Sequence, residues 1–439
     1  MTISKADIDR LGNLIRVERD NISDSTLNSL QEYRTSHKEI LSLTFKMLCL
    51  NTQKIHLTSI VTYRIKRFQS IIGKLHRYPE MRFNRMWDIG GCRCILRNNF
   101  DVYKLKDLIS KEADFEIVKE YDYIEKPQKD GYKSLHLFVK HKLSDKIIEV
   151  QVRNQIDHNW ATLVEITDVL YDSKLKEHSN NKDLLRFHFL LSKISELNIQ
   201  DKKEISQILK KYNYFERLSE VFSRNYIKVR RQWFDIEYKH SHKFFLIETS
   251  KDNVPKIESY KTSNEAEDSY FNVYKSRKNA NVVLTHLQKP SYSQISIAYS
   301  NYILTFHSFL TECYEILESL IVESLEKKQY IEYFKIYNLY NSLVFNHISN
   351  LKSDIREIGT YANETKNKKN KDKRKEKEWI EDIQKNVDES NDRRKKLIDK
   401  FRKSMPTSGF GKLAVIYITI YIDKKNQRKI KKVLALNSN

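Results

Sequence analysis

The chain has 439 residues, 40% of them hydrophobic, which is enough for roughly two or three domains with cores of their own. Its 8 glycines and 5 prolines favour long helices over elaborate loops. A run of about 18 apolar residues and an apolar leader are both lacking, so we expect a cytoplasmic protein without membrane contact. The net charge of +21 attracts polyanions such as nucleotides or nucleic acid. A Lys- and Asn-rich composition, as in an AT-biased genome, would give the same charge.

The first 175 residues are predicted to hold a helical segment and then the main domain. Residues 1–58 are predicted to be helical, because apolar side chains between Leu27 and Met47 recur near the helical period. Residues 59–175 mix helical and strand periodicity, which indicates an α+β domain with a small mixed β-sheet flanked by helices. The predicted strands are 92–96, 115–120, 135–140 and 146–153, and the predicted helices are 102–111 and one that opens near Gln155.

The middle of the chain is predicted to contain a connector and a second module. Residues 176–240 are predicted to be a helical connector, with a helical pattern over 183–227. Residues 241–330 are predicted to form an α/β module, and Thr262 and Glu265 match the capping box of a helix that ends near Tyr274. We interpret this module as regulatory or partner-binding, with a structural buttress as the alternative. Its other predicted elements are strands 244–248 and 281–285 and a helix over 299–325.

Residues 331–439 are predicted to be a helical, Lys-rich tail that ends in a β-strand at 413–422. We expect that strand to pair with a sheet in this chain or in a partner. A basic run in the tail is typical of a solvated arm or exposed helix, and less often of a nucleic-acid contact. Its members are Lys366, Lys368, Lys369, Lys371, Lys373, Arg374, Lys375 and Lys377.

The four cysteines, Cys49, Cys92, Cys94 and Cys313, lack the spacing of a metal site. Cys92 and Cys94 lie in an apparent strand, so they are predicted to be reduced thiols of the core.

Cations and a hydroxyl gather between Arg64 and Arg77. On a helix, Lys66, Ser70 and Lys74 would be four residues apart and share one face, as binding a triphosphate requires. An ordinary amphipathic surface helix has the same pattern, so the cluster alone does not identify a site.

Two carboxylates lie in settings that suit a ligand. Asp88 precedes Gly90 and Gly91 at the entrance of a strand, where a backbone can approach a ligand closely, although Asp and Gly also populate ordinary turns. Glu149 shares one face of the strand 146–153 with an amide and a guanidinium, opposite an apolar face. A carboxylate can hold a metal ion and a guanidinium can hold a phosphate. The side chains on the polar face are Glu149, Gln151 and Arg153.

A turn presents Tyr132 directly after Gly131. An aromatic face in such a turn can stack a purine, a contact worth about 1–3 kcal/mol in single-stranded nucleic-acid complexes. A packed surface tyrosine is the alternative in a chain that has 26 tyrosines. The cationic or titratable neighbours of this turn are Lys126, Lys129, Lys133 and His136, and Lys126, Lys129 and His136 are candidates for the phosphates of a stacked nucleotide.

In their order and spacing, these motifs resemble those of the RelA/SpoT synthetases, which make ppGpp and pppGpp, from about Ser59 to Asp172. The resemblance implies a nucleotidyltransferase-like fold and one Mg²⁺ site. It implies ATP binding by Arg64, Lys66, Ser70, Lys74, Arg77 and Arg93, and Mg²⁺ binding by Asp88 with Glu149. It implies that Tyr132 stacks on guanine and that Lys126, Lys129, Lys133, His136, Gln151 and Arg153 complete the guanosine pocket.

Three departures from the family pattern bear on function. Lys133 stands where the family has Arg, which keeps the charge and loses the planar fork. The family's Glu-His pair after Trp-Ala is represented by Glu165, one residue late, and by Ile166, which leaves the acceptor in doubt. The sequence has no His-Asp dipeptide, so the metal-dependent hydrolase half of the long family members is absent and we expect synthesis without hydrolysis.

The resemblance therefore implies transfer of pyrophosphate from ATP to the 3′-hydroxyl of GDP or GTP, with release of AMP and with control by the C-terminal region. The alternatives are the same transfer onto the 3′ end of tRNA, as in toxic relatives, and a non-catalytic RNA- or protein-binding descendant. Glu149 could be the general base, a Mg²⁺ ligand or both. Beyond the nucleotides, a regulatory protein or a second copy of the chain is a candidate partner.

Overall fold

The computed structural model forms two compact units, Met1–Thr162 with Lys228–Thr305, and Leu163–Ile227 with Phe306–Asn439. The described residues are 4–19, 21–173, 175, 181–218, 229, 232–233, 235–236, 239, 241–249, 255–276, 281–299, 307–364, 370–404, 413, 416–417 and 419–428.

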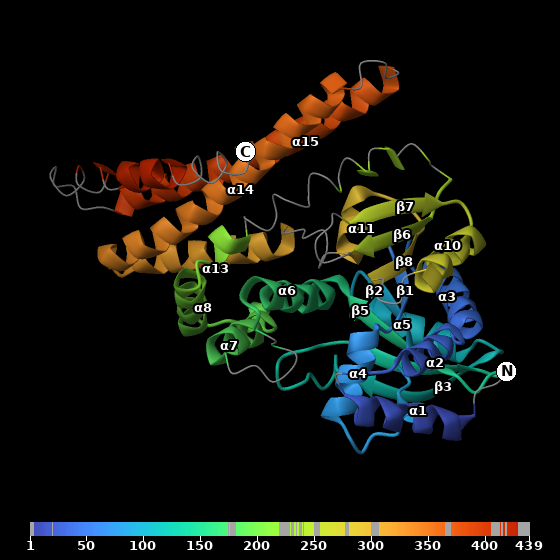
Figure 1. Cartoon of the computed structure of the whole chain (residues 1–439). Helices are drawn as coiled ribbons and strands as arrows, with labels where there is room; N and C mark the ends of the chain where they lie inside the picture. The colour runs from blue at the N-terminus through green and yellow to red at the C-terminus, as the bar shows by residue number, and fades with distance from the viewer. Residues whose placement is uncertain are drawn as a thin grey trace. The chain divides into compact units, whose positions relative to one another are not determined.

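The described strands of the first unit form one sheet of eight, in the order β3-β4-β5-β2-β1-β8-β6-β7 (Figure 1). Among them, β2 and β5 pair in parallel and the other neighbours are antiparallel. The strands are β1 (Ile60–Ile65), β2 (Gly90–Leu96), β3 (Phe115–Asp122), β4 (Leu135–His141), β5 (Ile147–Asn154), β6 (Phe244–Thr249), β7 (Lys256–Tyr260) and β8 (Asn281–Leu287).

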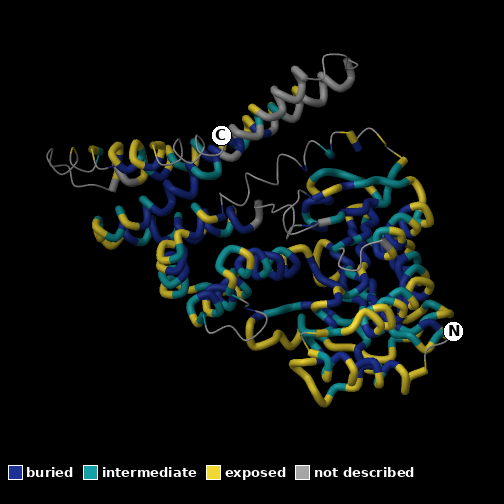
Figure 2. The backbone as a smooth tube through the Cα atoms, viewed as in Figure 1, coloured by how far each residue is buried: buried dark blue, intermediate teal, exposed yellow. Residues whose placement is uncertain are grey.

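One face of this sheet is covered by α3 (Lys38–Gln53), α5 (Asn99–Ser110) and α10 (Ser263–Ser276). Because side chains alternate along a strand, every second residue points into this layer. Figure 2 shows the buried residues concentrated along the strands and the inner sides of these helices. The layer's core includes Val61, Tyr63, Cys92, Cys94, Val150, Val152, Leu246 and Leu284. All four cysteines lie among the described residues and are buried and free, as predicted for core thiols.

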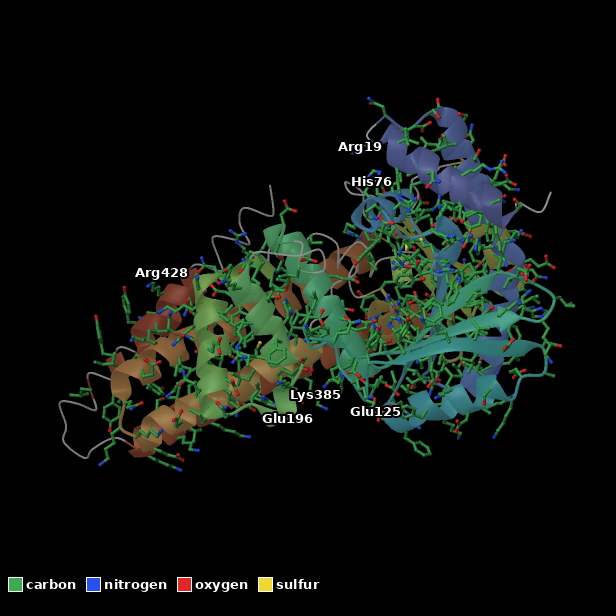
Figure 3. The ribbon with its side chains drawn as sticks, turned by 90° about the horizontal axis from the view of Figure 1, so that it is seen from below. Arg19, His76, Glu125, Glu196, Lys385 and Arg428 are labelled. Carbon is green, nitrogen blue, oxygen red and sulfur yellow. The ribbon has the colours of Figure 1, made fainter. Side chains whose placement is uncertain are left out.

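A helical group packs at the end of the sheet where β1 leads into α4 (Phe68–Arg77). It contains α1 (Lys5–Glu18), α2 (Asp24–Thr35) and the 3₁₀ helix η1 (Phe83–Arg85). Serine side chains cap both helices, since Ser4 accepts from the Asp7 amide and Ser23 from the Thr26 amide. In Figure 3, His76 of α4 lies beside α1, near the labelled Arg19, and its Nε2 is 3.3 Å from the Ile15 carbonyl oxygen.

The opposite face of the sheet is covered over β1 and β8 by α11 (Tyr292–Ala298). Apolar side chains of α11 pack there with Trp233, Phe245 and Leu287. After β5 the chain enters α6 (Gln155–Tyr171), and the boundary between the two units falls inside this helix. The neighbouring part of this face, over β1, β2 and β5, carries polar side chains that include Thr62, Arg93 and Gln151.

The described part of the second unit is helical. Its elements are the end of α6, α7 (Lys182–Leu191), η3 (Ile194–Glu196), α8 (Ile199–Lys211), α13 (His307–Glu326), α14 (Tyr330–Glu364) and α15 (Asn370–Ser404). α13 packs on α8 and α14, and α14 packs on α15. Within the ranges that the structure describes, none of the helices has the length and apolarity that crossing a membrane requires.

The α+β class, the helical first segment and the predicted strands of residues 92–153 are confirmed. The capping box is also confirmed, since Glu265 accepts from the Thr262 amide at 3.2 Å and Thr262 from the Glu265 amide at 3.3 Å. The part of the basic run from Lys371 to Lys377 lies in the helix α15, in agreement with the predicted helix. Lys366, Lys368 and Lys369 lie outside the described residues. Residues 219–227 and 300–306 of the predicted helices also lie outside them.

Three expectations differ from the structure. The module predicted at 241–330 is not separate, because β8 pairs with β1 and thereby adds β8, β6 and β7 to the main sheet. The strands β1 and β7 were not predicted, although the β-branched residues of Ile60–Ile65 favour a strand. The terminal strand at 413–422 is wrong, since the residues described there are helical. A short apolar run fits a strand and a buried helix equally well.

Candidate active site

The polar face of the sheet carries the candidate residues in two adjoining rows set by strand register. Glu149 of β5 pairs with Gly91 of β2, and Gly91 pairs with Arg64 of β1. In the second row, the neighbours across the same three strands are Gln151, Arg93 and Thr62. Because their sequence neighbours fill the core on the other face, these side chains project together on the polar face.

These rows form the floor of one pocket, and Asp88 joins them from the segment just before β2. The structure therefore brings together the two acidic residues, Asp88 and Glu149, that the sequence separates by 61 positions (149 − 88). The residues that line the pocket are Thr62, Arg64, Lys66, Asp88, Gly91, Cys92, Arg93, Glu149, Gln151, Val283, Ala298 and Tyr299.

Two lysines converge on one oxygen of Asp88. The Nζ atoms of Lys66 and Lys74 lie 2.7 Å and 3.0 Å from Asp88 Oδ2. The other oxygen, Oδ1, is buried and has no hydrogen-bond partner among the residues that the structure describes. Burial alone would raise the pKa of Asp88, but Lys66 and Lys74 outweigh it and lower the pKa, so the carboxylate is ionised at neutral pH.

The single helical face predicted for the cations is wrong. Arg64 lies on β1, Lys66 lies in the connection that follows, and only Ser70, Lys74 and Arg77 of the predicted set lie on α4. The backbone of Lys66 is held on both sides, because its amide donates to the Ile89 carbonyl at 2.8 Å and its carbonyl accepts from Arg34 Nε at 2.9 Å. A strand-turn-helix path thus replaces the helical face, and it still brings Lys66 and Lys74 to Asp88.

Glu149 belongs to a hydrogen-bonded chain of side chains. Its Oε1 lies 2.9 Å from His136 Nδ1, and His136 Nε2 lies 2.8 Å from the Tyr132 hydroxyl. Arg153 donates to the Tyr132 hydroxyl at 2.5 Å and to Gln151 Oε1 at 2.9 Å. Gln151 in turn donates to Glu149 Oε2 at 3.3 Å, which closes the network.

The donor and acceptor groups of these side chains determine the direction of each hydrogen bond in the network. Arg153 can only donate, so the Tyr132 hydroxyl accepts a hydrogen bond from it and donates one to His136 Nε2. A neutral His136 then carries its proton on Nδ1 and donates to Glu149. Burial, the largest influence, raises the pKa of Glu149, yet the hydrogen bond from His136, and the positive charge of this histidine when it is protonated, reverse the effect, so the pKa is lowered. Glu149 is therefore a carboxylate at neutral pH.

The ring of Tyr132 is fixed beside this network rather than buried in the core. The Arg153 guanidinium carbon lies 4.9 Å from the ring centroid, and the rings of Tyr123 and Trp160 lie at 6.0 Å and 6.5 Å. The ring is only half-buried. A fixed, partly exposed aromatic ring is what stacking of a base requires.

Several predicted site residues lie outside the pocket lining. Lys126 and Lys129 are exposed in the loop before Gly131, and Arg77 is exposed at the end of α4. Ser70, Lys74, Tyr132, Lys133, His136 and Arg153 also lie outside the lining, although hydrogen bonds join Lys74 to Asp88 and link Tyr132, His136 and Arg153 to Glu149. Glu165 and Ile166 lie in the part of α6 that belongs to the second unit.

Six of the lining residues were not among the predicted site residues, namely Thr62, Gly91, Cys92, Val283, Ala298 and Tyr299. Thr62 alternates with the core residues Val61 and Tyr63 on β1, and that alternation was the available signal. Val283, Ala298 and Tyr299 come from the added strands and α11, and no local pattern indicates that this segment reaches the pocket.

The carboxylate oxygens in the pocket suit a hard cation that is bound mainly by the phosphates of a substrate. No group of three His, Cys, Asp or Glu side chains suited to a metal occurs among the described residues. Mg²⁺ commonly binds one or two carboxylates together with substrate phosphates. The buried Oδ1 of Asp88, which lacks a hydrogen-bond partner in the described part of the chain, is a suitable first ligand, and Glu149 lines the same pocket.

Residues 63–176 match the family model described as a region found in RelA / SpoT proteins. The chain is 34% identical over 112 residues to the GTP pyrophosphokinase YwaC and 30% identical over 125 residues to the GTP pyrophosphokinase YjbM, both of Bacillus subtilis strain 168. These alignments cover 23% and 27% of this chain, and the chain spans only 53% and 59% of the two relatives.

Among solved structures, the small alarmone synthetase 1 of Bacillus subtilis is similar at 23% identity and a TM-score of 0.33, over 44% of this chain and 100% of that one. The same synthetase bound to its product pppGpp is similar at 25% identity and a TM-score of 0.27, over 34% and 78% of the two chains. The motif resemblance is confirmed by the family model, which matches residues 63–176 of this chain.

Proposed function

We propose that the first unit transfers the β,γ-pyrophosphoryl group of ATP to the 3′-hydroxyl of GDP or GTP, which forms ppGpp or pppGpp and AMP. The observation that carries this proposal is the pocket in which Asp88, with its two lysines, and Glu149, with its histidine, face the same space. The RelA/SpoT region and its similarity to two GTP pyrophosphokinases support the same activity.

The donor phosphates are proposed to lie at the side of the pocket formed by β1 and α4. Arg64 and Lys66 line it, and Lys74 reaches Asp88 from α4. The first turn of α4 begins two residues after Lys66 and contains Ser70, so backbone amides and a hydroxyl are close to these cations. In phosphoryl transfer, such positioning and charge stabilisation provide most of the catalysis.

The acceptor is proposed to lie at the side formed by β4 and β5. Tyr132 would stack on the guanine, and Glu149 would take the proton of the 3′-hydroxyl as general base. The new bond joins the 3′ oxygen to the β-phosphorus, while the bond from that phosphorus to the α,β-bridging oxygen breaks and AMP leaves. His136 donates to Glu149 and holds the carboxylate in place for this step.

Mg²⁺ is proposed as the cofactor, held by Asp88 Oδ1 and shared with Glu149. When bound, it would neutralise charge on the phosphates of ATP. This arrangement gives Lys66 and Lys74 the role of holding Asp88 through its other oxygen.

Control by the second unit is also proposed. Its described residues contribute none of the pocket lining, so they are available for another role. A chain truncated after Thr305 should differ from the full chain in basal rate, whereas an equal rate in a folded truncation would remove the support for control. Truncation near His240, where the sequence analysis placed the start of the second module, is unsuitable because it would remove β6, β7 and β8 from the sheet.

Product analysis tests the proposed transfer. The full chain is incubated with Mg²⁺, ATP, GDP, GTP and total tRNA together, and products are identified by mass spectrometry. Guanosine nucleotides that gain a 3′-pyrophosphate, with stoichiometric AMP, are expected. Pyrophosphate found on the RNA alone would show that tRNA is the acceptor. The absence of any transfer by the folded chain, with residues 306–439 both present and removed, would refute the proposal.

A further inference from the structure

The added strands and α11 contribute a wall to the pocket that none of the motifs predicts. Val283 lies on β8, and Ala298 and Tyr299 lie at the C-terminal end of α11. Val283 and Ala298 have only aliphatic side chains, and the other lining residues of the pocket are mostly charged or polar. One side of an otherwise polar pocket is therefore apolar.

This wall is rigidly held. Tyr299 is only 1% exposed and packs with Trp233 and Phe245. Its hydroxyl accepts from Thr285 Oγ1 at 2.6 Å and lies 3.1 Å from the Val283 carbonyl oxygen. The end of α11 is also tied to α6, because the Ile297 carbonyl accepts from His158 Nε2 at 2.8 Å. A rigid, preformed wall suits ligand recognition, since little entropy is lost when a ligand binds.

The same segment also holds the donor side from the opposite face of the sheet. The hydroxyl of Tyr270 on α10 accepts from the Ile65 amide at 2.7 Å, and the hydroxyl of Tyr274 donates to the Ile65 carbonyl at 3.3 Å. Ile65 lies between Arg64 and Lys66. Two contacts of the added segment thus fix the backbone that carries two of the pocket's cations.

The strand order decides which nucleotide the wall can reach. β8 is next to β1, and three strand spacings separate it from β5, which is about 14 Å at the usual spacing. The wall is therefore beyond Arg64 on the donor side, and Tyr132 and His136 are on the other side of Glu149. An apolar surface does not bind phosphate, so its ligand is the base or ribose of a nucleotide whose phosphates lie at Lys66 and Asp88.

We propose that Val283 and Ala298, held in place by the buried Tyr299, contact the nucleoside part of the nucleoside triphosphate donor and help to determine donor specificity. This inference rests on the proposed function. It makes β8 and the end of α11 a part of the donor site, in place of the regulatory or partner-binding role expected from the sequence for the 241–330 module.

Binding of a non-hydrolysable ATP analogue and of GDP to the full chain tests the inference. The Ala298→Leu variant fills the wall and should weaken binding of the ATP analogue about 10-fold or more, the effect expected of overpacking a fitted surface. Its affinity for GDP should stay within about 2-fold. Ser293→Leu, on the exposed side of the same helix, is the matched control and should change neither affinity.

A second variant keeps the test valid if Ala298→Leu does not fold. Val283→Thr keeps the side-chain shape and places a hydroxyl on the wall, and it should weaken ATP-analogue binding while the melting temperature stays near wild type. If either variant melts like wild type and binds the ATP analogue equally well, or loses GDP affinity instead, the inference is overturned. Because the readout is binding, a chain that binds the analogue at this wall and yet transfers nothing would refute the proposed function while supporting the inference.

Discussion

Gly91 allows the pocket floor to be perturbed without disturbing the fold. It lies between Glu149 and Arg64 in one row of the sheet, and its place on the polar face would direct an added methyl group into the pocket. The nearest atom to a Cβ built there is the Glu149 carbonyl oxygen at 3.7 Å, an ordinary van der Waals distance. Gly91→Ala should therefore change the free energy of unfolding by no more than about 1 kcal/mol.

The same methyl group should strongly reduce the rate. It would occupy the space in which the donor phosphates and the acceptor hydroxyl are proposed to meet. Displacing reacting groups by about 1 Å costs roughly 100-fold, so we expect kcat to fall by about that factor. Initial rates of pyrophosphate transfer and thermal melting, measured on the same preparation, give the two quantities.

Gly90→Ala is the matched control, because Gly90 is the neighbouring residue on the opposite face. A Cβ there would lie 2.9 Å from Ile148 Cδ1 and 3.6 Å from Leu41 Cδ1 in the core. This variant should lose about 1–3 kcal/mol of stability, and its folded fraction should retain more activity than Gly91→Ala. A Gly91→Ala enzyme with the wild-type rate would refute the placement of the reaction over this row, and an unfolded one would refute the geometry of the floor.

Four further predictions follow from the contacts around the two carboxylates. Lys66→Met leaves Asp88 with one of its two ion pairs and should raise the KM for ATP by about 10-fold, which is worth about 1.4 kcal/mol, and an unchanged KM would contradict its placement. Tyr132→Ala should weaken GDP binding by about 1–3 kcal/mol while ATP-analogue binding is kept, as titration calorimetry can show. The pKa of Glu149 is lowered below its ordinary 4.5, so its contribution to stability and to activity is present above pH 4.5 and is lost as the pH falls through the folded-state value. His136→Phe removes the hydrogen bond that lowers this pKa, so it should raise the pKa and move the acid limb of the kcat/KM profile to higher pH. An acid limb that does not move would mean that another group titrates there. Removing divalent ions with EDTA should abolish transfer and Mg²⁺ should restore it, and transfer that persists in EDTA would exclude the proposed metal site.

The strand that carries Glu149 was predictable, because its alternation is complete from Ile148 to Arg153. Asp88 was predictable as a residue at a strand entrance. The segment around Lys66 was not predicted correctly, since Lys66, Ser70 and Lys74 have helical spacing although the helix begins only at Phe68. Both geometries bring the lysines together, so spacing alone could not distinguish them.

The pocket wall could not be predicted from sequence for a different reason. The pairing of Tyr63 with Leu284 joins residues 221 positions apart (284 − 63), and nothing local to either strand specifies it. Both strands are rich in β-branched and apolar residues, which fit any neighbour on a half-buried sheet. The segment after residue 240 therefore looked like an independent module, although its strand β8 pairs with the edge of β1.

A double-mutant cycle on Asp88 and Glu149 tests the central claim most directly, that these two carboxylates act in one site. The kcat/KM for pyrophosphate transfer is measured for the wild type, Asp88→Asn, Glu149→Gln and the double variant, with melting temperatures to confirm folding. Residues that act as a unit are strongly non-additive, so the double variant should be about as slow as the slower single variant. Losses that multiply fully, or a Glu149→Gln enzyme at the wild-type rate, would contradict the account.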